Sequence, residues 1–179
     1  MNYTLEAIAR GLSTIPRWNG RTVLDRIGGR FSVLQHSLVC GALLEGVPVH
    51  QLYALLHDIE ECVVGDTPAG QKAQDQCDLG RAVRERMFRA LKVPVPDYNG
   101  VIWKAVKNVD YMSRSAEAYV LIHPRELQDG AYAEHLDMDA VDQVWGLLDI
   151  PPRVAIDLFV DKVQELFRDK QIERLRSQL

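Results

Sequence analysis

The amino-acid sequence predicts an all-α protein that forms a helical bundle, and three observations support this. Apolar residues recur every three or four positions along most of the chain, which is the spacing of one helix face. No segment shows the strict apolar–polar alternation that is typical of a half-buried strand. Glycine and proline interrupt the periodic segments, as expected for turns between helices.

The size and composition are those of one globular domain. The chain has 179 residues, of which 47% are hydrophobic and 26% are charged, and this is enough to bury one continuous core. The sequence contains no evident linker, repeat or low-complexity tract. We therefore expect residues 1–179 to form a single domain.

Three helices are expected in the first third of the chain. The first covers residues 3–12, where apolar side chains form one stripe. After a polar loop rich in glycine and arginine, Ser32 suits the N-cap of a second helix that runs to Leu44. Pro48 suits the first turn of a third helix, which runs to about Val64.

Four further helices are expected in the rest of the chain. Their predicted ranges are about 74–92, 99–123, 139–148 and 151–176. Proline residues follow the first of these ranges and open the last one, in the positions where helices tolerate proline.

The charge and the cysteine content predict a cytoplasmic protein with no stable nucleic-acid or membrane partner. The formal net charge is −4, so no broad positive field is available to hold a nucleic acid. Cys40, Cys62 and Cys77 form no CxxC pair, which suits a reduced chain, and the apolar settings of Cys40 and Cys62 predict packing roles. The N-terminal segment lacks the pattern of a signal peptide, and no apolar run is long enough to span a bilayer.

Ionisable residues interrupt three of the predicted apolar helix faces. His57 and Asp58 directly follow an apolar turn, and His36 and Asp110 interrupt the apolar positions of two other helices. Burying such groups without a partner is costly, and imidazole with carboxylate suits a divalent transition metal. Taken singly, a histidine of this kind is an ordinary core residue and the aspartate an ordinary surface charge. Together, the four residues predict one metal ion held between three helices.

These residues resemble the HD-domain metal phosphohydrolases, in particular the bacterial and phage branch with 5′-deoxynucleotidases and dATP triphosphohydrolases. The segment from Leu55 to Pro68 is similar to the family pattern L-x-H-D-x-x-E-x-x-x-G-D-x-P. The segment V-L-Q-H-S around His36 resembles V-x-E-H-S, with Gln35 in place of the acid, and V-K-N-V-D, which ends at Asp110, resembles V-K-x-A-D.

The resemblance implies an HD-type helical bundle that holds one divalent ion: Co, Mn, Zn, Fe, Ni or Mg. It covers about residues 17–120, and the C-terminal helices, at about 139–177, share only the helical pattern. His36, His57 and the two aspartates would be the metal ligands.

A carboxylate beside the ligands would handle the proton of the attacking water. Glu61 lies four residues after His57 and three after Asp58, but Glu60 is close to the same helix face, so spacing alone leaves both open. The family pattern favours Glu61 as the catalytic residue. Asp66, in the turn that follows, would position the water or the leaving oxygen, or would only cap the turn.

The phosphate of a substrate needs cations. By resemblance, Arg21 matches the family arginine fifteen residues before the first ligand histidine, and Lys72 matches a lysine six residues after the second acid. Arg26 and Arg30 suit a phosphate contact or a solvated surface equally. In the family an aromatic residue often follows the arginine and packs against the sugar. Here Trp18, three residues before Arg21, could fill that role or belong to the core.

The resemblance implies hydrolysis of a nucleotide phosphate by water on a divalent metal. A 5′-nucleotidase acting on deoxynucleoside monophosphates is the first expectation, and a dNTP triphosphohydrolase acting on a substrate such as dATP is the alternative. A non-catalytic module that senses a nucleotide is a third possibility, although every ligand residue and Glu61 are present. A purely structural helical protein would leave the motifs unexplained. Family members often form homo-oligomers, so we expect an oligomer.

Overall fold

The computed structural model describes most of the chain. The described residues are 3–20, 22, 30–66, 73–122 and 136–177. Within them the elements are helices, and extended backbone pairs only in an isolated antiparallel bridge between Pro16 and Ser32. The predicted all-α class is therefore confirmed.

The helices follow one another with mostly short connections. They are α1 (Leu5–Thr14), α2 (Val33–Ala42), α3 (Pro48–Leu55), α4 (Glu61–Val64), α5 (Gln74–Ala90), α6 (Val101–Leu121), α7 (Met138–Leu147), α8 (Pro152–Phe167) and α9 (Lys170–Arg176), and a short 3-10 helix (Arg17–Gly20) follows α1. Among the described helices, none is both long and apolar enough to cross a membrane.

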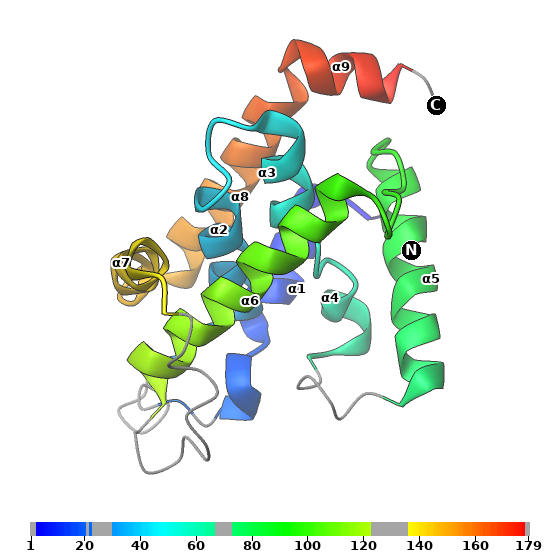
Figure 1. Ribbon diagram of the computed structural model, residues 1–179. Helices are drawn as coiled ribbons and strands as arrows, with labels where there is room; N and C mark the ends of the chain where they lie inside the picture. Colours follow the sequence, from blue (N-terminus) through cyan, green and yellow to red (C-terminus); the bar gives the residue numbers. More distant parts are fainter. Residues whose placement is uncertain (1–2, 21, 23–29, 67–72, 123–135, 178–179) are drawn as a thin grey trace.

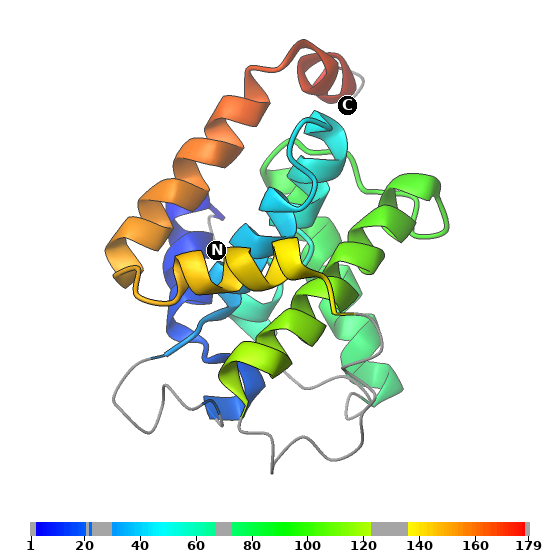
Figure 2. The same cartoon turned by 60° about the vertical axis from the view of Figure 1, so that its left-hand side comes forward.

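Helix α2 lies at the centre of the bundle. It packs against α1, α3, α6, α7 and α8, so neighbours surround it on several sides. Helix α6 runs diagonally across one face of the molecule (Figure 1), and α7 lies across α6 when the molecule is turned (Figure 2). Helix α5 stands at the edge of the bundle, where it contacts α4. A polar side chain on the inner faces of α2 is therefore removed from solvent.

Local sequence explains where several helices begin. The Thr4 hydroxyl oxygen accepts a hydrogen bond from the backbone N–H of Ala7 at the start of α1 (3.2 Å). At the start of α2, Ser32 and Gln35 satisfy each other's backbone N–H groups in a capping box. Pro48 occupies the first turn of α3. Both predicted starts, at Ser32 and at Pro48, are confirmed.

Two clusters of apolar side chains form the interior. The larger cluster joins α1, α2, α3, α5, α6 and α8 and contains the fully buried Phe88 and Phe159. The smaller cluster joins α2, α6 and α7 and contains Phe31, Val39 and Leu121. Each fully buried side chain of this size contributes about 1.5–3 kcal/mol. Helix α2 contributes side chains to both clusters, and this packing holds the helix and its polar side chains in place.

The third predicted helix, residues 48–64, is wrong as one continuous element. Helix α3 ends at Leu55, and α4 begins only at Glu61. His57 supplies the physical reason, because its Nδ1 donates to the carbonyl oxygen of Ala54 (2.7 Å), an acceptor that a continuing helix would use. The chain therefore turns at the very residues that were expected to bind metal.

The last predicted helix, residues 151–176, is also divided. Helix α8 ends at Phe167, and Asp169 caps the start of α9 by accepting from the N–H of Gln171 (2.8 Å). The other predicted helices agree with the structure to within about two residues at each end, which is the usual uncertainty of helix boundaries.

Candidate metal centre

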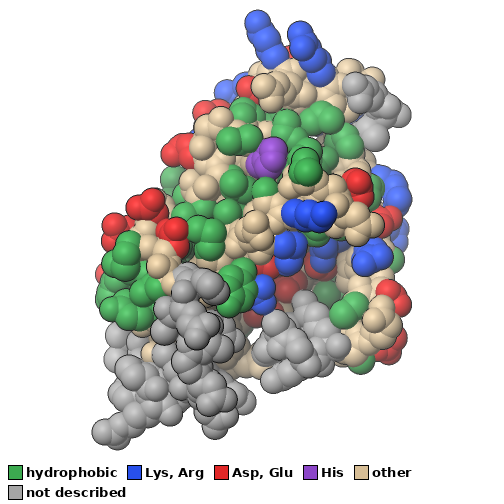
Figure 3. Space-filling view, viewed as in Figure 1, with side chains coloured by type: hydrophobic (Ala, Val, Ile, Leu, Met, Phe, Trp, Pro, Cys, Tyr) green, Lys and Arg blue, Asp and Glu red, His purple; other side chains and the backbone are tan. Residues whose placement is uncertain are grey.

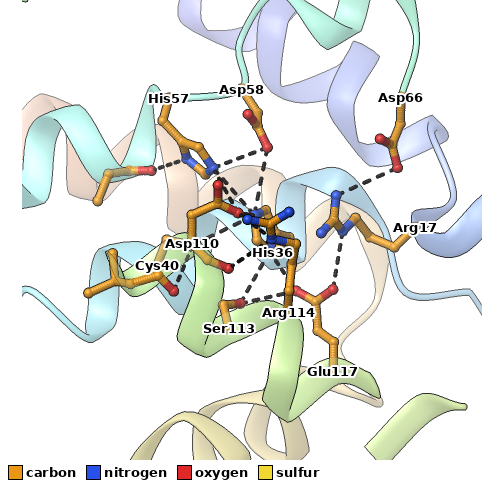
Figure 4. Close-up of polar contacts among 12 residues, drawn as sticks. Arg17, His36, Cys40, His57, Asp58, Asp66, Asp110, Ser113, Arg114 and Glu117 are labelled. Carbon is orange, nitrogen blue, oxygen red and sulfur yellow. Dashed lines mark hydrogen bonds and ion pairs between the residues drawn. The ribbon is translucent and has the colours of Figure 1, made fainter. Parts of the chain in front are cut away.

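The four residues expected to hold a metal lie together in the structure (Figure 4). His36 comes from α2, His57 and Asp58 from the turn between α3 and α4, and Asp110 from α6. The Nε2 atoms of the two histidines are 3.3 Å apart. Asp58 Oδ2 lies 3.1 Å from His57 Nε2 and 3.6 Å from His36 Nε2, and Asp110 Oδ1 lies 3.4 Å and 3.9 Å from His36 Nε2 and His57 Nε2.

These separations fit a shared ion. Two atoms bound to one divalent cation at about 2.0–2.2 Å lie roughly 3–3.6 Å apart on adjacent corners of its coordination sphere. The four donors are two imidazole nitrogens and two carboxylates, a set that suits a divalent transition metal. His36 and His57 are almost completely buried, and Asp110 is only 5% exposed. Asp58 has the most exposed side chain of the four, at 16%.

The hydrogen bonds at Nδ1 orient both histidines. A carbonyl oxygen can only accept, so the Nδ1 of His57 must donate to Ala54. The Nδ1 of His36 lies 2.5 Å from Oε1 of Glu117, a carboxylate that also accepts. Both Nε2 lone pairs therefore face the centre, where the oxygens of Asp58 and Asp110 also lie. These lone pairs and carboxylate oxygens repel one another unless protons or a cation occupy the space between them.

The pKa shifts have the same origin. Burial would lower the pKa of His57, but the charge of Asp58 and hydrogen bonds with Asp110 and Asp58 outweigh burial and raise it to about 10. Burial would raise the pKa values of Asp58 and Asp110, but the two histidines hold both well below their ordinary range. The acidic side chains thus favour positive charge at the centre, and a divalent cation can replace the protons there.

Cys40 also lies at this centre. Its Sγ is 3.7 Å from Nε2 of His36, which precedes Cys40 by one turn of α2, and 3.9 Å from the carbonyl oxygen of Val109. The potential donor atoms of Cys40, His36 and His57 all lie within 4.8 Å of one another, so this buried group could hold a metal ion. Two donor sets therefore share the histidine pair: one adds the two aspartates and the other adds the thiol.

Replacing Cys40 distinguishes the two donor sets. We expect Cys40→Ala to keep the wild-type affinity for Co²⁺, because two carboxylates neutralise a divalent ion better than one thiol hydrogen-bonded to a carbonyl oxygen. The measurement is a Co²⁺ titration followed by absorption spectroscopy, with Cys62→Ala as the control. A sulfur-to-cobalt charge-transfer band that disappears in Cys40→Ala, with a loss of affinity, would instead make the thiol a ligand.

The structure separates the two candidate carboxylates. Glu60 is buried and binds Arg84 of α5 through both oxygens, with Nε donating to Oε2 at 2.8 Å and Nη2 to Oε1. Glu61 is also buried, on the first turn of α4. Glu60 is thus committed to an ion pair, and Glu61 stays the candidate for proton transfer.

Removing Glu60 should cost stability without changing metal binding. We expect Glu60→Ala to lower the free energy of unfolding by about 3 kcal/mol, because it leaves the largely buried Arg84 without its counter-charge. Urea unfolding measures this effect, and the exposed i,i+4 pair of Glu85 and Arg89 provides the control. Arg89→Ala should cost less than about 1 kcal/mol. Equal losses from both variants would contradict the distinction.

The cation beside the centre is Arg17. Its Nε donates to Oε2 of Glu117 at 3.2 Å, and its Nη1 lies 3.6 Å from Oδ2 of Asp66. Burial would lower the pKa of Arg17, but Glu117 and Asp66 raise it above its ordinary value, so the guanidinium stays charged. Arg21 and Lys72, which were predicted to bind the substrate, lie outside the described residues. The prediction for Arg21 and Lys72 is therefore untested, and Arg17 is a further cation near the cluster.

Trp18 is held in an uncommon backbone conformation. Trp18 and Asn19 have φ values of 58° and 53°, a left-handed region that costs non-glycine residues about 1–2 kcal/mol each. The indole Nε1 of Trp18 donates to Oε2 of Glu117 at 3.1 Å. Trp18 is partly exposed, so its side chain is not a fully buried core residue.

Two further cations contact Asp110 from α6. The Nζ of Lys107 contacts Oδ2, and Nε of Arg114 lies 3.2 Å from Oδ1. Both cations are partly exposed. Figure 3 shows acidic side chains in a hollow at the middle of this face, with Lys and Arg side chains beside them. Lys107 and Arg114 are therefore partly exposed cations next to Asp110, where they could meet phosphate oxygens.

Sequence reasoning missed three contributors for which the sequence held a signal. Arg17 is followed directly by an aromatic residue, Trp18, as in the arginine–aromatic pattern that the resemblance implies. Glu117 is a single acid between Ala116 and Ala118, seven residues after Asp110 and therefore on the same face of α6. Arg114 lies four residues after Asp110, at the spacing of a helical ion pair.

Comparison with known proteins identifies a relative without a stated function. No family model matches the chain. An uncharacterized protein of Rhodobacter capsulatus is 36% identical over 130 residues, which cover 66% of this chain and 62% of the relative. The chain thus spans less than two thirds of that protein's length.

Proposed function

We propose that the protein is a divalent-metal-dependent nucleotide phosphohydrolase, and that its substrate is a deoxynucleoside 5′-monophosphate. One observation carries the proposal: the Nε2 atoms of His36 and His57 lie 3.3 Å apart, and one carboxylate oxygen each of Asp58 and Asp110 lies 3.1–3.9 Å from both of them. The resemblance of the same residues to HD-domain phosphohydrolases supports it. A cytoplasmic location and a homo-oligomeric state stay predictions.

The side chains can be given roles in hydrolysis. His36, His57, Asp58 and Asp110 would hold the ion, which when bound supplies Lewis acidity and an activated water. The water oxygen forms a new bond to phosphorus while the bond from phosphorus to the 5′-oxygen breaks. Glu61 would take a proton from the water, and return of that proton to the leaving 5′-oxygen would give the nucleoside and regenerate Glu61.

Arg17 and Asp66 would act on the phosphate side of the site. Arg17 is a permanently charged, buried guanidinium and suits a bidentate grip on phosphate oxygens. Asp66 lies next to that guanidinium, where it would orient Arg17 and stand near the leaving oxygen. Gly65, with a φ of 80°, turns the chain at the end of α4 just before this residue.

A dNTP triphosphohydrolase is the second candidate, and a specific observation favours it. Lys107 and Arg114 are partly exposed beside Asp110, where additional phosphate groups would need cations. The reaction would break the bond from the α-phosphate to the 5′-oxygen and release triphosphate. The same cluster and the same Glu61 would serve both reactions.

Product analysis tests the proposal. The full chain, stripped of metal by a chelator, is incubated with each NMP, dNMP and dNTP plus Mn²⁺ or Co²⁺, and the products are separated by chromatography. We expect nucleoside and inorganic phosphate from dNMPs in the presence of metal only, and none from the Asp58→Ala control. Triphosphate release would favour the second candidate. Tight nucleotide binding with no hydrolysis under any condition would contradict both and indicate a sensing module.

A further inference from the structure

Glu117 is a fully buried carboxylate that does not face the centre of the cluster. It lies on α6, seven residues after Asp110. Its Oε1 accepts from Nδ1 of His36 at 2.5 Å and from the hydroxyl of Ser113 at 3.0 Å. Its Oε2 accepts from Nε of Arg17 at 3.2 Å and from Nε1 of Trp18 at 3.1 Å. Figure 4 shows Glu117 between the side chains of His36 and Arg17.

The four donors fill the hydrogen-bonding capacity of one carboxylate. An ionised carboxylate offers about four lone-pair sites, two on each oxygen. Donors from three separate segments of the chain therefore hold Glu117 in a fixed position, and one of them is the guanidinium of Arg17.

This carboxylate determines how His36 meets the cluster. With its proton on Nδ1 and bonded to Glu117, His36 presents an Nε2 lone pair to the centre, and its ring cannot turn without breaking that bond. A carboxylate on the far nitrogen also makes a ligating imidazole more basic. His57 obtains the same orientation from the neutral carbonyl of Ala54.

We propose that Glu117 is a positioning residue of the metal centre: it fixes His36 for metal binding, and Arg17, Trp18 and Ser113 in turn fix Glu117. The inference rests on the proposed function to the extent that the His36 cluster binds a divalent ion. It adds a role for a carboxylate that the ligand motifs do not include. It also connects the ligand His36 to the cation Arg17 through one side chain.

A purely structural role for Glu117 makes a different prediction. A carboxylate that only neutralised Arg17 would affect folding stability and leave an ion bound as before. Glu60 offers the matched case, because it is also buried, binds the partly buried Arg84, and lies only two residues from Asp58. Glu60→Gln removes the same charge near the cluster without touching either ligand histidine.

The experiment is a Co²⁺ titration of the full chain, read by the visible absorption of the bound ion. We expect Glu117→Gln to weaken Co²⁺ binding by about 10–100-fold, the usual effect of losing such a partner, and to change the ligand-field spectrum because His36 is reoriented. Glu60→Gln should keep the wild-type affinity and spectrum. Circular dichroism establishes that each variant is folded.

Ser113→Ala keeps the inference testable if Glu117→Gln fails to fold. The Ser113 hydroxyl lies 3.0 Å from Glu117 Oε1 and 3.1 Å from His36 Nδ1, and its loss leaves the carboxylate in place. We expect a smaller loss of Co²⁺ affinity with a shifted spectrum. A folded Glu117→Gln with wild-type Co²⁺ affinity and spectrum would overturn the inference. Equal losses of Co²⁺ affinity in Glu117→Gln and Glu60→Gln would also overturn it. If Glu117→Gln does not fold, a Ser113→Ala protein with wild-type Co²⁺ affinity and spectrum would overturn the inference instead.

The titration needs no turnover, so its outcome is distinct from that of the product analysis. If no nucleotide is hydrolysed but Glu117→Gln alone weakens Co²⁺ binding, the proposed function fails and the role of Glu117 stands. If hydrolysis occurs and Co²⁺ binding does not depend on Glu117, the proposed function stands and the role of Glu117 fails.

Discussion

Replacing Asp58 with alanine is expected to abolish both metal binding and hydrolysis while the protein stays folded. Asp58 Oδ2 is 3.1 Å from His57 Nε2 and 3.6 Å from His36 Nε2, so it would share an ion with both histidines. Removing it leaves one carboxylate to neutralise a divalent charge. The loss of metal affinity should exceed roughly 100-fold, which is the upper end of the loss caused by removing a residue that only hydrogen-bonds to a ligand.

The fold should survive this substitution. The Asp58 side chain is the most exposed of the four and lies in a turn rather than inside a helix, so alanine creates no buried apolar cavity. Metal content after dialysis, turnover and circular dichroism are measured together. Asp142→Ala, which removes an exposed aspartate from α7, is the control and should match the wild type. An Asp58→Ala protein with wild-type turnover would contradict the ligand assignment.

Replacing Glu61 with alanine should keep the metal and the nucleotide but remove most hydrolysis. Glu61 is buried on the first turn of α4, three residues after Asp58. A general base typically contributes about 10²–10⁴-fold in rate, so only a trace of turnover should remain. The effect should appear in kcat, because a general base acts on the chemical step.

Metal content and nucleotide affinity, measured beside turnover, separate the possible outcomes. Glu60→Gln is the matched control, and we expect it to stay active because Glu60 is bound to Arg84. Loss of the metal in Glu61→Ala would make Glu61 a ligand instead of a base. Full activity in Glu61→Ala would assign the proton to another group, such as Asp66, and would refute this part of the mechanism.

Much of the fold could be predicted because helix signals are local. The capping box of Ser32 and Gln35, and Pro48 in a first turn, depend only on neighbours along the chain. The break between Leu55 and Glu61 could not be predicted in this way. It accompanies the hydrogen bond of His57 to the carbonyl oxygen of Ala54, and His57 there meets His36 of α2, which is distant in sequence.

The cluster of four residues could be predicted because His36 and Asp110 interrupt apolar helix faces and His57 and Asp58 directly follow an apolar helical turn. A face that packs inward carries its polar side chain inward too, and the cost of burying it implies a common partner. The approach of Arg17 to the cluster could not be predicted, because it depends on a contact with Glu117, which lies 100 residues further along the chain. The sequence predicts a packing role for Cys40, and the contact of its thiol with Nε2 of His36, at 3.7 Å, is found only in the structure.

X-ray absorption at the cobalt edge of the Co²⁺-loaded protein tests the central claim most directly. The account predicts one ion per chain with nitrogen and oxygen neighbours at about 2.0–2.2 Å and the outer-ring scattering of two imidazoles. The ligands would be His36, His57, Asp58 and Asp110. A sulfur neighbour at about 2.3 Å, or a bound ion without imidazole scattering, would contradict it.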